Sequence, residues 1–136
     1  MKSPRFWIAV LAASLLMWLL SGLWNLVIMS GFAREHAAHL MRETLMIAPI
    51  IVGYLVLSFL LGVAYLRAKV SGSPLQKGIK VGAFMGLAWV LPFSLVLHGV
   101  LDYPLPPVIV DALWAILEVG TGGALIGLIM GAKEVE

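Results

Sequence analysis

Two carboxylates lie in a segment that is otherwise apolar enough to cross a membrane, the stretch "VIVDALWAILEVGTGG". Asp111 and Glu118 stand seven residues apart, so a helix points both the same way, about 10 Å apart along its axis. A charge near the centre of a bilayer costs about 2.5–3.5 kcal/mol on the insertion scale. Glu118 therefore needs a partner, a wet cavity or a bound proton. The pair is a candidate site for a proton, a cation or a small polar molecule.

Polar residues of two other apolar runs can extend this site. His98 and Asp102 stand four residues apart at the outer end of the preceding run, and the turn "YPLPP" returns the chain to Asp111 at a similar depth. We expect these three side chains to form the entrance of a polar funnel, with Glu118 deeper. Asn25 lies on the polar face of the first run and is a further candidate. The structural alternative is a buried polar clasp that locks the helices together.

A second group of ionisable residues lies in the outer segment "REHAAHLMRE". A helix over 32–44 stacks Glu35, His39 and Glu43 at intervals of four, with His36 adjacent. Carboxylate and imidazole groups together can bind zinc or another divalent metal. The alternative is a solvated amphipathic helix on the outer membrane surface, whose arginines pair with the glutamates.

The composition indicates the elements that must position these residues. The chain is 62% hydrophobic and only 12% charged, whereas a soluble domain is nearer half apolar and a quarter charged. Four apolar runs are each long enough to cross about 30 Å of hydrocarbon as a helix, at about 6–29, 46–66, 81–101 and 108–130. The sequence therefore predicts an all-α protein, a single membrane domain over 1–136 folded as a four-helix bundle in the lipid bilayer.

Charge and cysteine content narrow the classes further. The net charge of +2 gives no case for a nucleic-acid partner, and the absence of cysteine excludes disulfides, thiol catalysis and thiolate metal sites. Seven lysines and arginines fall on one side of the predicted spans, and two on the other: Lys2, Arg5, Arg67, Lys69, Lys77, Lys80 and Lys133 against Arg34 and Arg42. The positive-inside rule then places both termini in the cytoplasm.

Glycines in the last run indicate close helix packing. Gly120, Gly123, Gly127 and Gly131 include two overlapping G-x-x-x-G spacings, which let another helix approach closely. We expect this packing within the bundle, and the alternative is the contact surface of a homodimer.

The segment "VDALWAILEVGTGGALIGLIMG", with "LW" before the first loop, resembles the signature of small four-helix prokaryotic membrane proteins that have no assigned activity. The resemblance implies a four-span protein of the prokaryotic inner membrane and no catalytic residue.

Three functions fit these observations. The first is a non-enzymatic membrane protein that binds or moves a proton, cation or small polar molecule at Glu118, Asp111, His98, Asp102 and Asn25. The second is an accessory or assembly subunit of a larger membrane complex, docked through its glycines and aromatic residues. The third is a membrane enzyme that uses the histidines with a divalent metal or another cofactor, whose identity the residues leave open.

Overall fold

The computed structural model describes residues 3–131, so Lys2 and Lys133, which the charge count includes, lie outside the described residues. This part of the chain contains helices and connections but no strand. The helices are α1 (Pro4–Gly22), a π-helical continuation η1 (Leu23–Ile28), α2 (Ser30–Ala37), a 3₁₀ turn η2 (Ala38–Leu40), α3 (Ile47–Arg67), α4 (Pro74–Val100) and α5 (Leu105–Met130). Four helical segments are long and apolar enough to cross a membrane, which confirms the predicted all-α class: Pro4–Ile28, Ile47–Arg67, Pro74–Val100 and Leu105–Met130.

Local sequence explains why α4 and α5 are longer than their apolar runs. α4 begins at Pro74 because Ser73 and Gln76 form a capping box. Ser73 Oγ accepts a hydrogen bond from the Gln76 N–H at 3.2 Å, and Gln76 Oε1 accepts one from the Ser73 N–H at 3.1 Å. α5 begins after Pro104 and ends at Met130, before Gly131, whose φ of 68° favours a residue without a Cβ atom.

The outer connection does not form the continuous helix expected over 32–44. α2 ends at Ala37, and the single turn η2 ends at Leu40. Residues 41–46 form an irregular connection to α3. His39 and Glu43 therefore do not lie one turn apart on a common helix.

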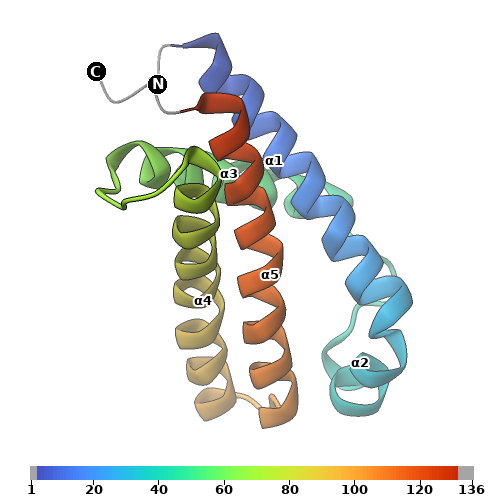
Figure 1. Cartoon of the computed structure of the whole chain (residues 1–136). Coiled ribbons are helices and arrows are strands. Elements are labelled where there is room, and N and C mark those ends of the chain that lie inside the picture. Colours follow the sequence, from blue (N-terminus) through green and yellow to red (C-terminus); the bar gives the residue numbers. More distant parts are fainter. Residues whose placement is uncertain (1–2, 132–136) are drawn as a thin grey trace.

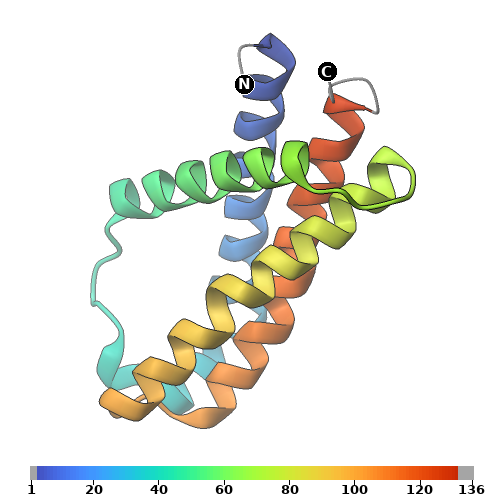
Figure 2. The same ribbon diagram turned by 90° about the vertical axis from the view of Figure 1, so that its left-hand side faces the viewer.

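Figure 1 shows α4 and α5 as an antiparallel pair, with α1 tilted against α5 and α2 at the end of the molecule where the chain turns from α4 into α5. In Figure 2, α3 runs across α1 and the α4–α5 pair instead of alongside them. The buried residues of α3 all belong to its C-terminal half, from Leu57 to Tyr65. Its N-terminal half extends beyond the other helices (Figure 2).

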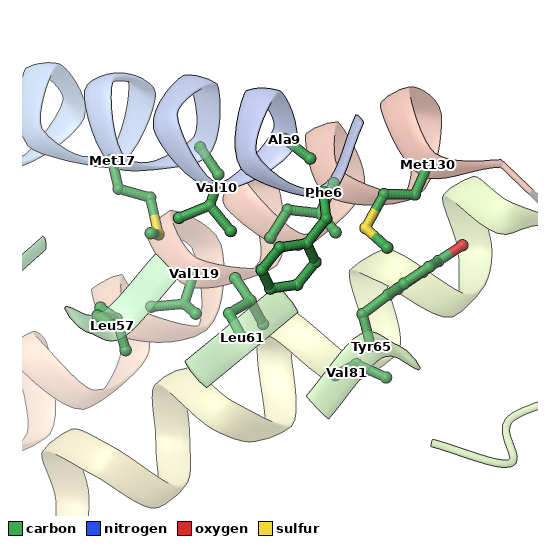
Figure 3. Packing of buried hydrophobic residues seen from close by; sticks show 12 residues of the cluster. Phe6, Ala9, Val10, Met17, Leu57, Leu61, Tyr65, Val81, Val119 and Met130 are labelled. Carbon is green, nitrogen blue, oxygen red and sulfur yellow. The ribbon is translucent and has the colours of Figure 1, made fainter. Parts of the chain in front are cut away.

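An apolar core joins α1, α3 and α5, as the close view in Figure 3 shows. Phe6 and Met17 of α1 and Leu61 of α3 are completely buried, and Phe6 lies against the backbone of α3 at Gly62. The Tyr65 hydroxyl donates a hydrogen bond to the Gly131 carbonyl at 3.3 Å, which joins the end of α3 to the end of α5. Large apolar side chains on the outer faces of all four spans are exposed, as expected for helices that face lipid.

Closely spaced glycines form the contact between α4 and α5, called here the glycine seam. On α4 the seam consists of Gly78, Gly82 and Gly86, at intervals of four residues. A Cβ atom on Gly82 would overlap the carbonyl oxygen of Val119, and one on Gly123 would overlap the carbonyl oxygen of Gly78. The two backbones are therefore in direct contact, and no side chain fits between them at these positions.

The glycines expected to pack have different surroundings. Gly123 and Gly127 belong to the glycine seam, since a Cβ atom on Gly127 would overlap the Pro74 carbonyl oxygen. Gly120 lies beside it, with room for a Cβ atom 3.7 Å from the Ala83 nitrogen, and Gly131 faces open space. Because α4 occupies the seam, Gly123 and Gly127 give no support to a homodimer or to docking of a partner protein.

We predict that Gly82→Ala lowers the free energy of unfolding by about 1–3 kcal/mol, because the added methyl group forces two backbones apart. Gly99 on the same helix has no atom within 4 Å of an added Cβ, so Gly99→Ala is the matched control. The control should leave stability unchanged or raise it by about 0.5–1 kcal/mol. Unfolding of each purified variant by denaturing detergent, followed by circular dichroism, measures the two changes in stability. Equal effects of Gly82→Ala and Gly99→Ala would contradict direct backbone contact at the glycine seam.

Candidate functional site

Glu118 is buried, with 7% of its surface exposed, close to the midpoint of α5. Its polar neighbours are the hydroxyl of Tyr54 on α3 and the indole of Trp114 on α5. One turn further along α5, a Cβ atom on Gly122 would lie 2.6 Å from Met17 Sδ of α1. The carboxyl group therefore faces α1 and α3, on the side of α5 away from the glycine seam.

A polar chain continues from Glu118 into α1. The hydroxyl of Tyr54 interacts with Ser21 as well as with Glu118. Asn25 Nδ2 donates hydrogen bonds to the Ser21 carbonyl at 2.9 Å and to Ser21 Oγ at 3.2 Å. The candidate residue Asn25 thus lies near the site, and Ser21 and Tyr54 separate it from the carboxyl group.

Asp111 is half-buried nearer the start of α5 and has its own aromatic partners. The Tyr103 hydroxyl donates a hydrogen bond to Asp111 Oδ2 at 3.2 Å, and the indole of Trp24 also interacts with the carboxylate. Burial, with the neighbouring Asp111 carboxylate, raises the pKa of Tyr103 to about 12. Tyr103 therefore keeps its proton at physiological pH and acts as the donor in this hydrogen bond.

Two stacked indoles separate the carboxylates. The rings of Trp24 and Trp114 have centroids 4.3 Å apart and planes inclined by 2°. Trp24 interacts with Asp111, whereas Trp114 lies beside Glu118 with its Nε1 buried and making no hydrogen bond within the described residues. Trp24 belongs to the π-helical segment η1, in which the Met29 N–H donates to the Trp24 carbonyl at 2.8 Å. Such wide turns recur at functional sites in other proteins.

The structure places His98 and Asp102 at the connection between α4 and α5, away from Glu118. His98 Nδ1 lies 2.6 Å from the Tyr103 carbonyl oxygen. The Asp102 side chain is completely exposed, and its carboxylate lies 3.9 Å from His39 Nε2. His98 and Asp102 therefore reach the expected funnel entrance only indirectly, because the residue of this turn that hydrogen-bonds to Asp111 is Tyr103.

The outer segment does not bring its four candidate metal ligands together. His36 Nδ1 contacts the Phe32 carbonyl oxygen of its own helix at 3.0 Å, and His39 faces the α4–α5 connection. Across residues 3–131, no three His, Asp or Glu side chains gather closely enough to hold a metal ion. The role of Glu35 and Glu43 as metal ligands thus stays a prediction from the sequence.

Neither carboxylate of α5 has a cationic partner among residues 3–131. The one ion pair in this part of the chain joins His39 with Asp102. Glu118 has instead a hydroxyl and an indole N–H, both neutral groups, within an apolar core. A site of this kind can hold a proton or solvate a single positive charge.

A search of curated proteins and a search of solved structures found no match to this chain. The model of a family described as "Predicted membrane protein (DUF2177)" matches residues 6–129. The match covers the four spans and both carboxylates of α5, in agreement with the resemblance seen in the sequence. The chain therefore belongs to the DUF2177 family of membrane proteins.

Proposed function

We propose that the protein binds a proton at Glu118 and exchanges it with water through Asp111. The observation that carries the proposal is a carboxyl group at the middle of a membrane-spanning helix, buried and without a cationic partner in the described chain. An unpaired charge at this depth costs several kcal/mol, so a bound proton stabilises the fold.

The donor set favours a proton over a divalent cation. Calcium and magnesium require six or more oxygen ligands within about 2.6 Å. Glu118 and Asp111 are about 10 Å apart along α5, and the stacked indoles of Trp24 and Trp114 lie between them. A single proton needs only one carboxyl oxygen and a neighbouring hydroxyl such as that of Tyr54.

The two carboxylates take different roles in this proposal. Asp111 lies near the start of α5 and contacts Tyr103 of the connecting turn, so it exchanges protons with water. Glu118 lies deeper and holds the proton. The stacked indoles separate them, and transfer requires a water molecule or a side-chain movement at Trp24 and Trp114.

We predict that dicyclohexylcarbodiimide, an apolar reagent that modifies protonated carboxyl groups, labels Glu118 in the folded protein at neutral pH. Labelling should fall as the pH rises, because the reagent requires the protonated acid. Mass spectrometry of the peptide containing Glu118 measures the product, and the exposed carboxylate of Asp102 is the internal control. A Glu118 that stays unlabelled while the protein is folded would argue against the bound proton.

The substitution Glu118→Gln separates proton binding from the polar clasp. Glutamine keeps the shape and hydrogen-bonding capacity of the acid but cannot release a proton. We expect stability within about 1 kcal/mol of the native protein and the loss of one titrating group in a pH-indicator measurement of proton release from the purified protein. A variant that loses several kcal/mol but keeps the same proton release would support the clasp instead.

We also propose that both termini lie in the cytoplasm of a prokaryotic cell. Among the described residues, four basic side chains lie at or near the α3–α4 connection: Arg67 at the end of α3, Lys69 in the connection, and Lys77 and Lys80 in the N-terminal part of α4. The start of α1 and the end of α5 lie toward this same end of the molecule (Figure 1). The α2 segment, with Arg34, lies at the other end.

The absence of native cysteine makes this orientation easy to test. We predict that a membrane-impermeant maleimide added to intact cells labels Met41→Cys, in the outer connection, and labels Ser71→Cys only after the cells are permeabilised. Both positions are exposed in the folded chain, so folding does not block either one. The reverse labelling pattern would overturn the proposed orientation.

A further inference from the structure

We infer that His39 and His98 are positioning residues, which together hold the Asp102–Tyr103 backbone so that the Tyr103 hydroxyl covers Asp111. This inference rests on the proposed role of Asp111 in proton exchange. It assigns His98, which the sequence predicts at the entrance, His39 of the outer segment and the connecting turn to the control of access to that carboxylate.

Three hydrogen bonds form the arrangement, called here the turn latch. His98 Nδ1 lies 2.6 Å from the Tyr103 carbonyl oxygen, and His39 Nε2 lies 2.8 Å from the Asp102 carbonyl oxygen. The Tyr103 hydroxyl then donates to Asp111 Oδ2 at 3.2 Å. His39 and His98 thus hold the carbonyls of two adjacent residues, Asp102 and Tyr103. The Tyr103 side chain reaches the Asp111 carboxylate.

The chemistry of the groups fixes the direction of each bond. A carbonyl oxygen only accepts, so His98 must carry its proton on Nδ1 and His39 must carry its proton on Nε2. Tyr103 remains protonated because its pKa lies near 12, and it donates to the carboxylate. Every bond of the turn latch is therefore available while both imidazoles are neutral.

The latch joins segments that are distant along the chain. His39 belongs to η2, His98 to the last turn of α4, and Asp111 to α5. Residues 41–46 are irregular, so the contact of His39 with Asp102 ties the outer segment to the α4–α5 connection. Loss of either histidine frees the turn at one carbonyl, and water then reaches Asp111 more often.

The test is labelling of Asp111 in the full-length protein by a water-soluble carbodiimide with a small amine, resolved by peptide mass spectrometry. We expect His98→Ala and His39→Ala each to raise labelling of Asp111 by roughly three- to tenfold, the change expected from losing one hydrogen bond. Labelling of Glu118 should not change, because it lies beyond the stacked indoles. Tyr103→Phe, which keeps the ring and removes the donor, should also raise labelling of Asp111.

Conservative variants distinguish positioning from a general loosening of the fold. Asparagine places an N–H where His98 Nδ1 stands, and glutamine places one where His39 Nε2 stands, so His98→Asn and His39→Gln should restore low labelling. His36→Ala is the matched control, since the hydrogen bond and the ring contact of His36 are both made with Phe32 of its own helix. His36→Ala should leave the labelling of Asp111 at the level of the native protein.

Several results would overturn the turn latch. They are equal labelling of Asp111 in His98→Ala and His36→Ala, no rescue by His98→Asn, or a parallel rise at Glu118. Failure of the proposed proton site would give a different result. Glu118 of the native protein would then not react with dicyclohexylcarbodiimide, independently of how strongly Asp111 is labelled.

Discussion

The structure depends on one constraint, which is the presence of an ionisable group in a region where an unpaired charge is costly. Glu118 lies near the midpoint of α5, almost fully buried, and no described lysine, arginine or histidine forms an ion pair with it. The neighbouring hydroxyl and indole of Tyr54 and Trp114 can bond a neutral acid, but they cannot neutralise a carboxylate. A proton on Glu118 removes this conflict, and for this reason we connect the burial of the acid to proton binding.

The packing of α4 explains why the acid faces α1 and α3. Along the glycine seam, the backbones of α4 and α5 touch at Gly82 and Gly123, so that side of α5 has no room for a glutamate. The opposite side is crossed by α3 and flanked by α1, and side chains fill the space between these helices (Figures 2 and 3). Close packing on one face of α5 thus leaves the other face for Asp111 and Glu118.

The fold class and the burial of Glu118 could be predicted from sequence, because both follow from hydropathy and helical spacing along one segment. The partners of the acid could not. Periodicity along single helices does not tell which helix crosses which face. The sequence therefore predicts His98 and Asp102 at an entrance above Glu118 but does not predict its neighbours Tyr54 and Trp114. The indole stack depends on the wide turn η1, for which "LWNLVI" has no local signal. The spacing of Gly78, Gly82 and Gly86 is readable in the sequence, but only Gly82 and Gly86 lie inside the apolar run predicted at 81–101, so the run alone does not show all three intervals.

The central claim is that Glu118 is a protonated acid inside the folded protein, and infrared spectroscopy tests it most directly. The carbonyl stretch of a protonated carboxylic acid is distinct from the bands of a carboxylate. We predict that the native protein in lipid at neutral pH shows a protonated-acid band that is missing from the Glu118→Gln variant and shifts after exchange into heavy water. If replacing Glu118 removes only carboxylate bands, the acid is ionised in the folded protein and the account is wrong.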